Sequence, residues 1–240
     1  MWIVKQYVNE LAPFLTTLVN ASFRDGSFPS TQKCAVVTLA LKKATLDPFD
    51  LSNYRPISNL TFVSKLLERC AYEQMVDYLQ LHQLLPEEQS AYRRFHSTET
   101  AMLKVLSDAY VAADSGQVTL LGLFDLSAAF DSVDHKVLIQ RLRHTCGFAG
   151  SALQWITSYL TDRSQFVRFN GATSNATSVL YGVPQGSVLG PVLFLLYVVE
   201  VIQLVKDRGF CPHAFADDLQ VYGHTLPTDF TELRGVWQPV

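Results

Sequence analysis

The sequence has few cysteines, no long apolar segment and no strong net charge, and each shortage excludes a class of protein. Its four cysteines form no C-x-x-C pair, which argues against a disulfide framework and for a reducing compartment. The pairs His144/Cys146 and Cys211/His213 have poor spacing for zinc. The longest apolar run, 188–199, is too short to span a bilayer, and no signal peptide is visible. We therefore expect an intracellular protein that is not secreted and needs no membrane, with the choice between cytoplasm and nucleus left open.

The composition is that of a folded chain. Of its 240 residues, 48% are hydrophobic and 17% charged, so it can bury a sizeable core. The net charge of -3 decides nothing about a nucleic-acid partner. Two segments have a local excess of positive charge. The segment from Lys33 to Arg69 contains six basic and three acidic residues, and the segment from Lys136 to Arg168 contains five basic residues and one acidic residue. Such segments suit a protein that grips phosphates, although ordinary solvated surface explains them equally well.

Hydrophobic periodicity predicts a mixed α and β chain. Helices are expected over about 61–81, 134–146, 151–160 and 191–207, with a hairpin over 35–58 and a strand, tight turn and strand over 212–222. The run 118–124 is continuously apolar, which predicts a strand buried on both faces. A further helix is expected from an N-cap at Ser97 to Gly116, with an apolar stripe at Met102, Val105, Leu106 and Ala109.

Three aspartates stand at the ends of predicted strands. Asp125 closes the apolar run, and Asp217 and Asp218 occupy the hairpin turn. Carboxylates beside apolar strands are costly to bury without a cation. Two magnesium ions would explain all three, since Mg²⁺ takes oxygen ligands and such a pair, about 3.5–4 Å apart, stabilises both oxygens of an in-line phosphoryl displacement. The alternative is a helix-entry residue at Asp125 and a plain turn at 217–218.

Five segments, in order, resemble a known family. Residues 124–131 (FDLSAAFD), 182–191 (GVPQGSVLGP) and 215–219 (FADDL) resemble the three palm motifs of reverse transcriptases, with 92 residues from Asp125 to Asp217. Upstream, residues 53–58 (NYRPIS) and 89–100 (QSAYR followed by HSTET) resemble the fingers of non-LTR, LINE-type retrotransposon enzymes. Any one motif is a modest signal, and the ordered set is specific.

The resemblance implies a fold and a division of the chain. The expected fold class is α+β, a right-hand polymerase with fingers and palm, in which the palm has a ferredoxin-like core and an antiparallel sheet. We expect an N-terminal helical extension at 1–30, fingers at 31–117, palm at 118–225 and a divergent tail at 226–240, with the thumb absent.

The resemblance also implies an activity. The chain would be an RNA-directed DNA polymerase that adds deoxynucleoside triphosphates to the 3′-hydroxyl of a DNA primer on an RNA template. Asp125, Asp217 and Asp218 would be catalytic and would hold two Mg²⁺ ions, with Mn²⁺ as an alternative. Phe130 would crowd the ribose and favour deoxynucleotides, a role compatible with its being a core phenylalanine. Further nucleotide contacts would come from Gln185, Gly186, Arg93, Arg55 and Lys42, because glycine admits close approach and guanidinium suits phosphate.

Three departures from the family limit this reading. The usual Gly-Phe is replaced by Ala91-Tyr92, and an Asn-Asp pair expected near Val199-Glu200 is lost. Residues 226–240 match neither the lysine-bearing fourth motif nor the primer grip, so we expect impaired catalysis by this truncated form. The alternative is a non-catalytic nucleic-acid-binding remnant. An RNA-dependent RNA polymerase is a third reading, and Phe130 and Ala216 favour the DNA-making branch.

Overall fold

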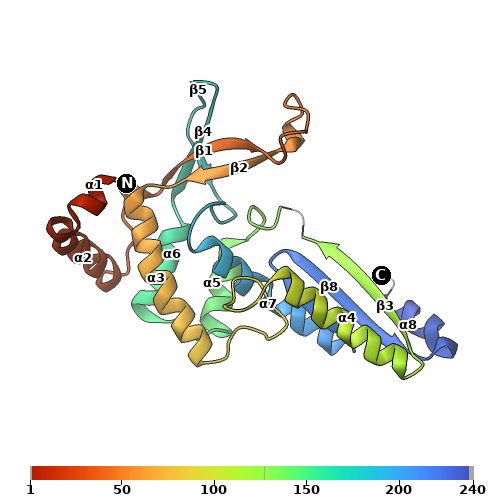
Figure 1. Cartoon of the computed structure of the whole chain (residues 1–240). Coiled ribbons are helices and arrows are strands. Elements are labelled where there is room, and N and C mark those ends of the chain that lie inside the picture. Colours follow the sequence, from red (N-terminus) through yellow and green to blue (C-terminus); the bar gives the residue numbers. More distant parts are fainter. Residues whose placement is uncertain (1, 127, 238–240) are drawn as a thin grey trace. The chain divides into compact units, whose positions relative to one another are not determined.

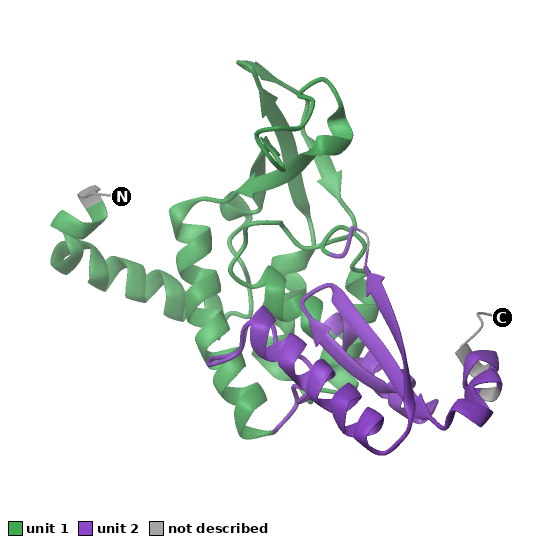
Figure 2. Ribbon diagram, turned by 45° about the vertical axis from the view of Figure 1, so that its right-hand side comes forward, with its two compact units in different colours: residues 1–82, 130–196 green, residues 83–129, 197–240 purple. Residues whose placement is uncertain are grey.

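The computed structural model describes residues 2–126 and 128–237, which form two compact units (Figures 1 and 2). The first unit comprises residues 1–82 and 130–196, and the second comprises 83–129 and 197–240. Each unit is therefore assembled from two separate stretches of chain. Helix α7 (Gly190–Asp207) contributes its N-terminal part to the first unit and the rest to the second. The expected boundaries of fingers and palm stay a prediction.

The first unit contains a five-stranded sheet. Its order is β2-β1-β4-β5, and β6 also pairs with β4. Strands β1 (Cys34–Leu41) and β2 (Tyr54–Asn59) are antiparallel, which confirms the predicted hairpin. Strand β4 (Arg163–Phe169) runs parallel to β1, while the short β5 (Ala172–Thr173) and β6 (Thr177–Val179) are antiparallel to β4.

Helices complete the first unit, and side chains cap the start of two of them. The helices are α1 (Trp2–Gln6), α2 (Val8–Arg24), α3 (Phe62–Leu81), α5 (His135–His144) and α6 (Gly150–Leu160), with 3-10 turns at Ser30–Gln32 and Leu51–Asn53. The Thr61 hydroxyl accepts a hydrogen bond from Ser64 N at 3.0 Å, and Asp134 Oδ1 accepts from Lys136 N at 2.7 Å. Such caps satisfy amides that have no partner inside the helix. The predicted helices 61–81, 134–146 and 151–160 are thus confirmed.

Aromatic rings dominate one part of the first unit's core. Phe28 lies edge-on to both Trp155 and Tyr159, with ring centroids 5.5 and 5.2 Å apart. All three rings are buried, and the Trp155 indole donates to the Ser22 hydroxyl at 2.8 Å. Edge-to-face packing of this kind adds to the stabilisation from burial alone. The same core contains the fully buried aliphatic side chains Leu67, Leu79, Leu138, Leu142, Ile156 and Leu160.

The second unit is a three-stranded antiparallel sheet with helices. Strand order is β3-β8-β7, formed by β3 (Val118–Asp125), β8 (Asp218–Thr225) and β7 (Cys211–Phe215). Helix α4 (Thr98–Asp114) begins with a capping box of Ser97 and Thr100, as predicted for Ser97, and α8 (Phe230–Trp237) follows a 3-10 turn at Pro227–Asp229. A cluster of Ile202, Phe210, Ala214, Leu219 and Val221 forms its core.

Two expectations about burial in the second unit are wrong. Strand β3 is not buried on both faces, because Leu123 is 73% exposed and Leu121 45%. Within the part of the chain that the structure describes, the strand lies at the edge of its sheet and pairs with β8 alone, whereas continuous apolar runs mark buried strands mainly in parallel sheets. In α4 the buried positions are Ala101, Val105 and Ala112, while Met102 and Leu106 are exposed. No helix in the described part of the chain is long and apolar enough to cross a membrane.

Candidate active site

The three aspartates lie at one end of the second unit's sheet. Asp125 is the last residue of β3, and its partner across the ladder is Asp218, the first residue of β8. Asp217 precedes it in the turn between β7 and β8, and its carbonyl accepts a hydrogen bond from Leu126 N at 3.2 Å. Directly opposed residues in an antiparallel pair have Cβ atoms about 4.5–5.5 Å apart. The fold therefore gathers three acidic residues that stand up to 93 positions apart in sequence.

The negative charges of the three aspartates repel one another at this end of the sheet. Burial, together with the charges of Asp217 and Asp125, raises the pKa of the Asp218 carboxyl. Like charges at short range disfavour the ionised form, and a cation between them would reverse that effect. Among residues 2–126 and 128–237, however, no three His, Cys, Asp or Glu side chains converge as a ready-made metal site.

The donor set still fits magnesium. Its ligands would be carboxylate oxygens, and Mg²⁺ is commonly held by only one or two carboxylates together with waters and substrate phosphates. A site completed by substrate therefore needs no cluster of three converging side chains beforehand.

Tyr92 lies near the acidic end and interacts with Asp217. In the sequence it stands out only because the family usually has phenylalanine at this position. Its side chain is half-exposed, and its backbone φ is +58°. Burial and then the Asp217 carboxylate raise the pKa of its hydroxyl, so the phenol stays protonated and the two groups interact electrostatically. The family's usual phenylalanine would bring no hydroxyl to this position.

The loop of the second palm motif is fixed within the first unit. Gly182 N donates to Val133 O and Val183 N to Phe130 O, each at 2.8 Å, and Gly182 O bonds to the His135 ring at 2.7 Å. Gly182 has φ +84°, and a Cβ there would lie 2.9 Å from Phe130 O. Only glycine fits this contact. The loop is thereby tied to the first palm motif and to the residues that follow it.

Gln185 and Gly186 lie against strand β2. Ser58 N donates to Gln185 O at 2.8 Å, and a Cβ on Gly186 would approach Ser58 O to 3.1 Å. The close approach expected of Gly186 is therefore made here to protein backbone. Gln185 also lines a pocket of about 510 Å³ that includes Asp131 and residues of β1, β2, β4 and β6. Burial raises the pKa of the Asp131 carboxyl.

Phe130 is packed inside the first unit. Its ring lies 5.4 Å from that of Phe194 on α7, with the planes tilted by 36°. The residue as a whole is partly buried. This placement agrees with a core phenylalanine and leaves its role in sugar selection a prediction.

The three predicted triphosphate contacts belong to different units. Lys42 follows β1 and Arg55 lies on β2, so both are on the hairpin of the first unit. The Lys42 ammonium donates to Ser52 O at 2.9 Å. Arg93 belongs to the second unit, donates to Leu85 O at 2.8 Å and has its pKa lowered by burial.

Glu68 was not recognised from the sequence, although it supports the second palm motif. The side chain is fully buried on α3, and its Oε2 accepts from Val188 N at 2.7 Å and from Leu189 N at 3.3 Å. Its Oε1 accepts from the Ser64 hydroxyl at 3.0 Å. Burial raises the pKa of Glu68 despite these bonds. No local signal marks this role, because the partners are 120 residues away.

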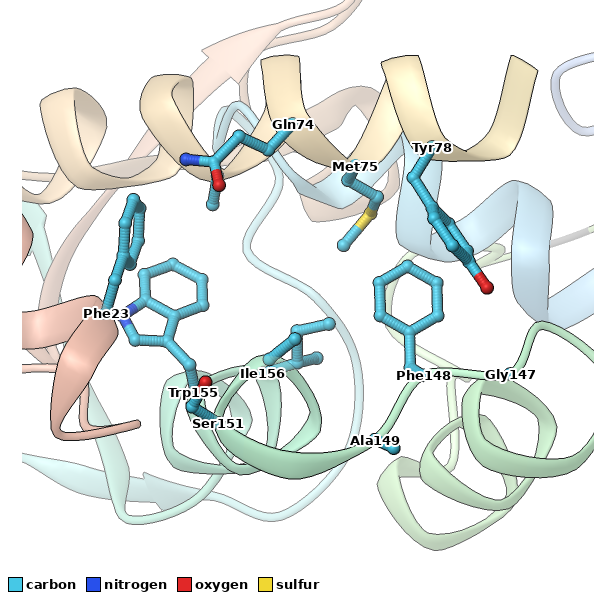
Figure 3. Close-up of a pocket in the computed structure, with 12 residues that line it drawn as sticks. Phe23, Gln74, Met75, Tyr78, Gly147, Phe148, Ala149, Ser151, Trp155 and Ile156 are labelled. Atoms are coloured by element: carbon cyan, nitrogen blue, oxygen red, sulfur yellow. The ribbon is translucent and has the colours of Figure 1, made fainter. Parts of the chain in front are cut away.

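An apolar pocket in the first unit is separate from all the predicted site residues. It measures about 340 Å³ and lies among α3, α6 and the end of α2 (Figure 3). Trp155 and Ile156 face Met75 across it, and Tyr78 and Phe148 line one end. None of the nine residues expected to bind metal or nucleotide lines this pocket. The pocket is therefore not part of the candidate active site.

Comparison with known proteins identifies the family. The model of the reverse transcriptase (RNA-dependent DNA polymerase) family matches residues 41–236, and the chain belongs to that family. The match takes in 226–236, a segment that resembled no family motif on inspection. The resemblance to reverse transcriptases stated from the motifs is confirmed.

Relatives come from mobile elements of Drosophila melanogaster. The chain is 31% identical over 231 residues to "Probable RNA-directed DNA polymerase from transposon X-element", covering 88% of this chain and 25% of the relative. It is 27% identical over 213 residues to the RNA-directed DNA polymerase from mobile element jockey, covering 87% of this chain and 23% of the relative. The chain thus spans about a quarter of the length of these relatives.

Solved structures share the fold at low identity. Telomerase from Candida albicans, in complex with a TWJ fragment of telomeric RNA, matches with a TM-score of 0.61 and 12% identity over 90% of this chain and 41% of that one. Apo telomerase from Candida tropicalis, truncated from its C-terminal domain, matches with a TM-score of 0.56 and 13% identity over 86% of this chain and 46% of that one. These matches confirm the expected α+β polymerase fold.

Proposed function

We propose that this chain carries the catalytic fingers and palm of an RNA-directed DNA polymerase. The observation that carries the proposal is the grouping of Asp125, Asp217 and Asp218 at one end of an antiparallel sheet, in a chain of the reverse transcriptase family. Its substrates are an RNA template, a DNA primer and deoxynucleoside triphosphates. The RNA-directed polymerases among its relatives and the telomerase fold support this choice.

Asp125 and Asp217 are the residues proposed to hold two Mg²⁺ ions, or Mn²⁺, with Asp218 beside them. When bound, such a pair stabilises the attacking and leaving oxygens of phosphoryl transfer. The chain's own contribution is placement, since the ladder between β3 and β8 sets the spacing of Asp125 and Asp218 before substrate arrives. Preorganised groups of this kind need no rearrangement as charge develops.

The first unit is proposed to bind the incoming nucleotide. Lys42 and Arg55 on the hairpin supply positive charge for the triphosphate. Gln185 and Gly186 form the surface beside the base and template, fixed by their contacts to Ser58. The Phe130 ring, held against Phe194, excludes a 2′-hydroxyl.

Primer extension by the purified chain tests this function. With an RNA template, a DNA primer and Mg²⁺, wild type should incorporate deoxynucleotides, and Asp217→Asn should lose at least about a thousandfold in rate. Asp77→Asn, at an exposed position on α3, is the matched control and should keep wild-type activity. Binding of primer–template without any extension would refute the proposal and identify a non-catalytic nucleic-acid-binding protein.

A further inference from the structure

The residue before Asp217 has an unfavourable backbone conformation. Pairing between β7 and β8 ends at Phe215 and Asp218, which leaves Ala216 and Asp217 as the two turn residues. Ala216 has φ +58°, in the left-handed region. A Cβ makes this region costly, and glycine is the residue that normally occupies it. Other contacts must therefore stabilise the turn.

The side chain of Gln89 makes those contacts. Its Oε1 accepts a hydrogen bond from Ala216 N at 3.1 Å, and its Nε2 donates to Ala216 O at 3.4 Å. The same Oε1 accepts from Ala91 N at 2.9 Å. Only 2% of Gln89 is exposed, so water cannot readily replace these bonds. Loss of a partner in such a place leaves a buried polar group unsatisfied.

The backbone around Gln89 is itself anchored to β7. Ser90 N donates to Ala214 O at 2.9 Å, and Ala214 N donates to Glu88 O at 2.8 Å, so residues 88–90 pair with the strand beside the turn. The Ser90 hydroxyl and the His213 ring are 3.0 Å apart. Because the backbone of Gln89 is fixed here, its carboxamide reaches the turn from a rigid support.

We propose that Gln89 is a positioning residue, which clamps both peptide groups of Ala216 and thereby fixes the turn that carries Asp217. Asp217 follows Ala216 directly, and its carbonyl accepts from Leu126 N next to Asp125. The orientation of this turn therefore affects the spacing of the acidic residues. The catalytic consequence rests on the proposed polymerase function, whereas the clamp concerns only hydrogen bonds within this chain.

Amide hydrogen exchange on the full 240-residue chain tests the clamp. In Gln89→Met, which preserves size but not hydrogen bonding, the Ala216 amide should exchange at least about tenfold faster than in wild type. The amides of Leu219 and Val221 on β8 should keep their protection. Gln80→Met, at an exposed position on α3, is the control and should change none of these rates. Unchanged exchange at Ala216 in Gln89→Met would overturn the proposal.

Gln89→Glu separates the hydrogen bond from packing. Its carboxylate keeps an acceptor for Ala216 N but loses the donor to Ala216 O, so the Ala216 amide should exchange faster than in wild type and more slowly than in Gln89→Met. If Gln89→Met unfolds the second unit, this variant decides the question, and wild-type exchange at Ala216 or exchange at the rate of an unprotected amide, with β8 intact, would each refute the clamp.

Binding of Mn²⁺ alone, followed by electron paramagnetic resonance, tests the consequence for the aspartates. Outer residues that orient metal ligands typically change affinity by about 10–100-fold, and Gln89→Met should weaken Mn²⁺ binding by at least about tenfold, while Gln80→Met should not. Equal affinity of wild type and Gln89→Met would overturn the positioning role. If wild type itself binds no Mn²⁺ in the absence of substrate, the metal site is one that substrate phosphates complete, and hydrogen exchange decides the role of Gln89 while primer extension decides the polymerase function.

Discussion

Replacement of Glu68 should separate the value of its hydrogen bonds from the cost of its charge. In the wild type, Val188 N and Leu189 N donate hydrogen bonds to Glu68 Oε2 at 2.7 and 3.3 Å. Glu68→Ala leaves both amides without this acceptor. An unsatisfied buried donor costs about 1–3 kcal/mol, and the longer bond counts at the lower end of that range. The one methylene that is lost adds about 0.8 kcal/mol. We therefore expect the free energy of unfolding to fall by about 3–5 kcal/mol.

Glu68→Gln should behave differently, because the amide can accept and donate in the same places without a charge. Burial has raised the pKa of Glu68, so its folded pKa lies above the ordinary value of 4.5. The folded chain therefore binds this proton more tightly, and protonation favours folding below pH 4.5, a contribution that is lost as pH rises through the folded pKa. At pH 7 the glutamine variant should be within about 1 kcal/mol of wild type or more stable, and this step in the pH dependence should disappear.

Urea denaturation followed by circular dichroism, at several pH values from 4 to 8, measures both effects. Glu73→Ala is the matched control on the same helix, since Glu73 is exposed, and it should change stability by less than about 0.5 kcal/mol. If Glu68→Ala is as stable as Glu73→Ala, the carboxylate does not support the start of α7. If Glu68→Gln keeps the wild-type pH dependence, another group is responsible for it.

Three further perturbations test other parts of the site. Phe130→Ala should raise the use of ribonucleotides relative to deoxynucleotides, and an unchanged ratio of kcat/KM values for the two sugars would exclude it from sugar selection. Gly182→Ala should lower the free energy of unfolding by about 2 kcal/mol or more, because its φ is +84° and the new Cβ would meet Phe130 O; a stable variant by urea denaturation would contradict this reasoning. Arg55→Ala should raise KM for the deoxynucleotide more than it lowers kcat, and steady-state kinetics showing unchanged KM would remove Arg55 from the triphosphate site.

The elements of this fold, and the segments that form its candidate site, could be predicted from the sequence because their signals are local. Helix periodicity, the Ser97 cap and the hairpin at 35–58 each depend on residues a few positions apart. The family motifs are equally local, since five short segments in order sufficed to identify the family later matched over 41–236. The sequence also identified Asp125, Asp217 and Asp218 as candidates, because carboxylates beside apolar strands stand out chemically.

Burial and long-range support were decided only by the tertiary structure. The apolar run of β3 does not reveal that the strand lies at a sheet edge, because strand order depends on pairing partners about 100 residues away. Glu68 looks like an ordinary polar residue in the sequence, and Gln89 stands out only as the first residue of a segment that resembles the family. Their importance comes from bonds to Ala216 and Val188, which only the folded chain brings within reach. A side chain's hydrogen-bonding role depends on which backbone groups are buried beside it, and local sequence does not encode that.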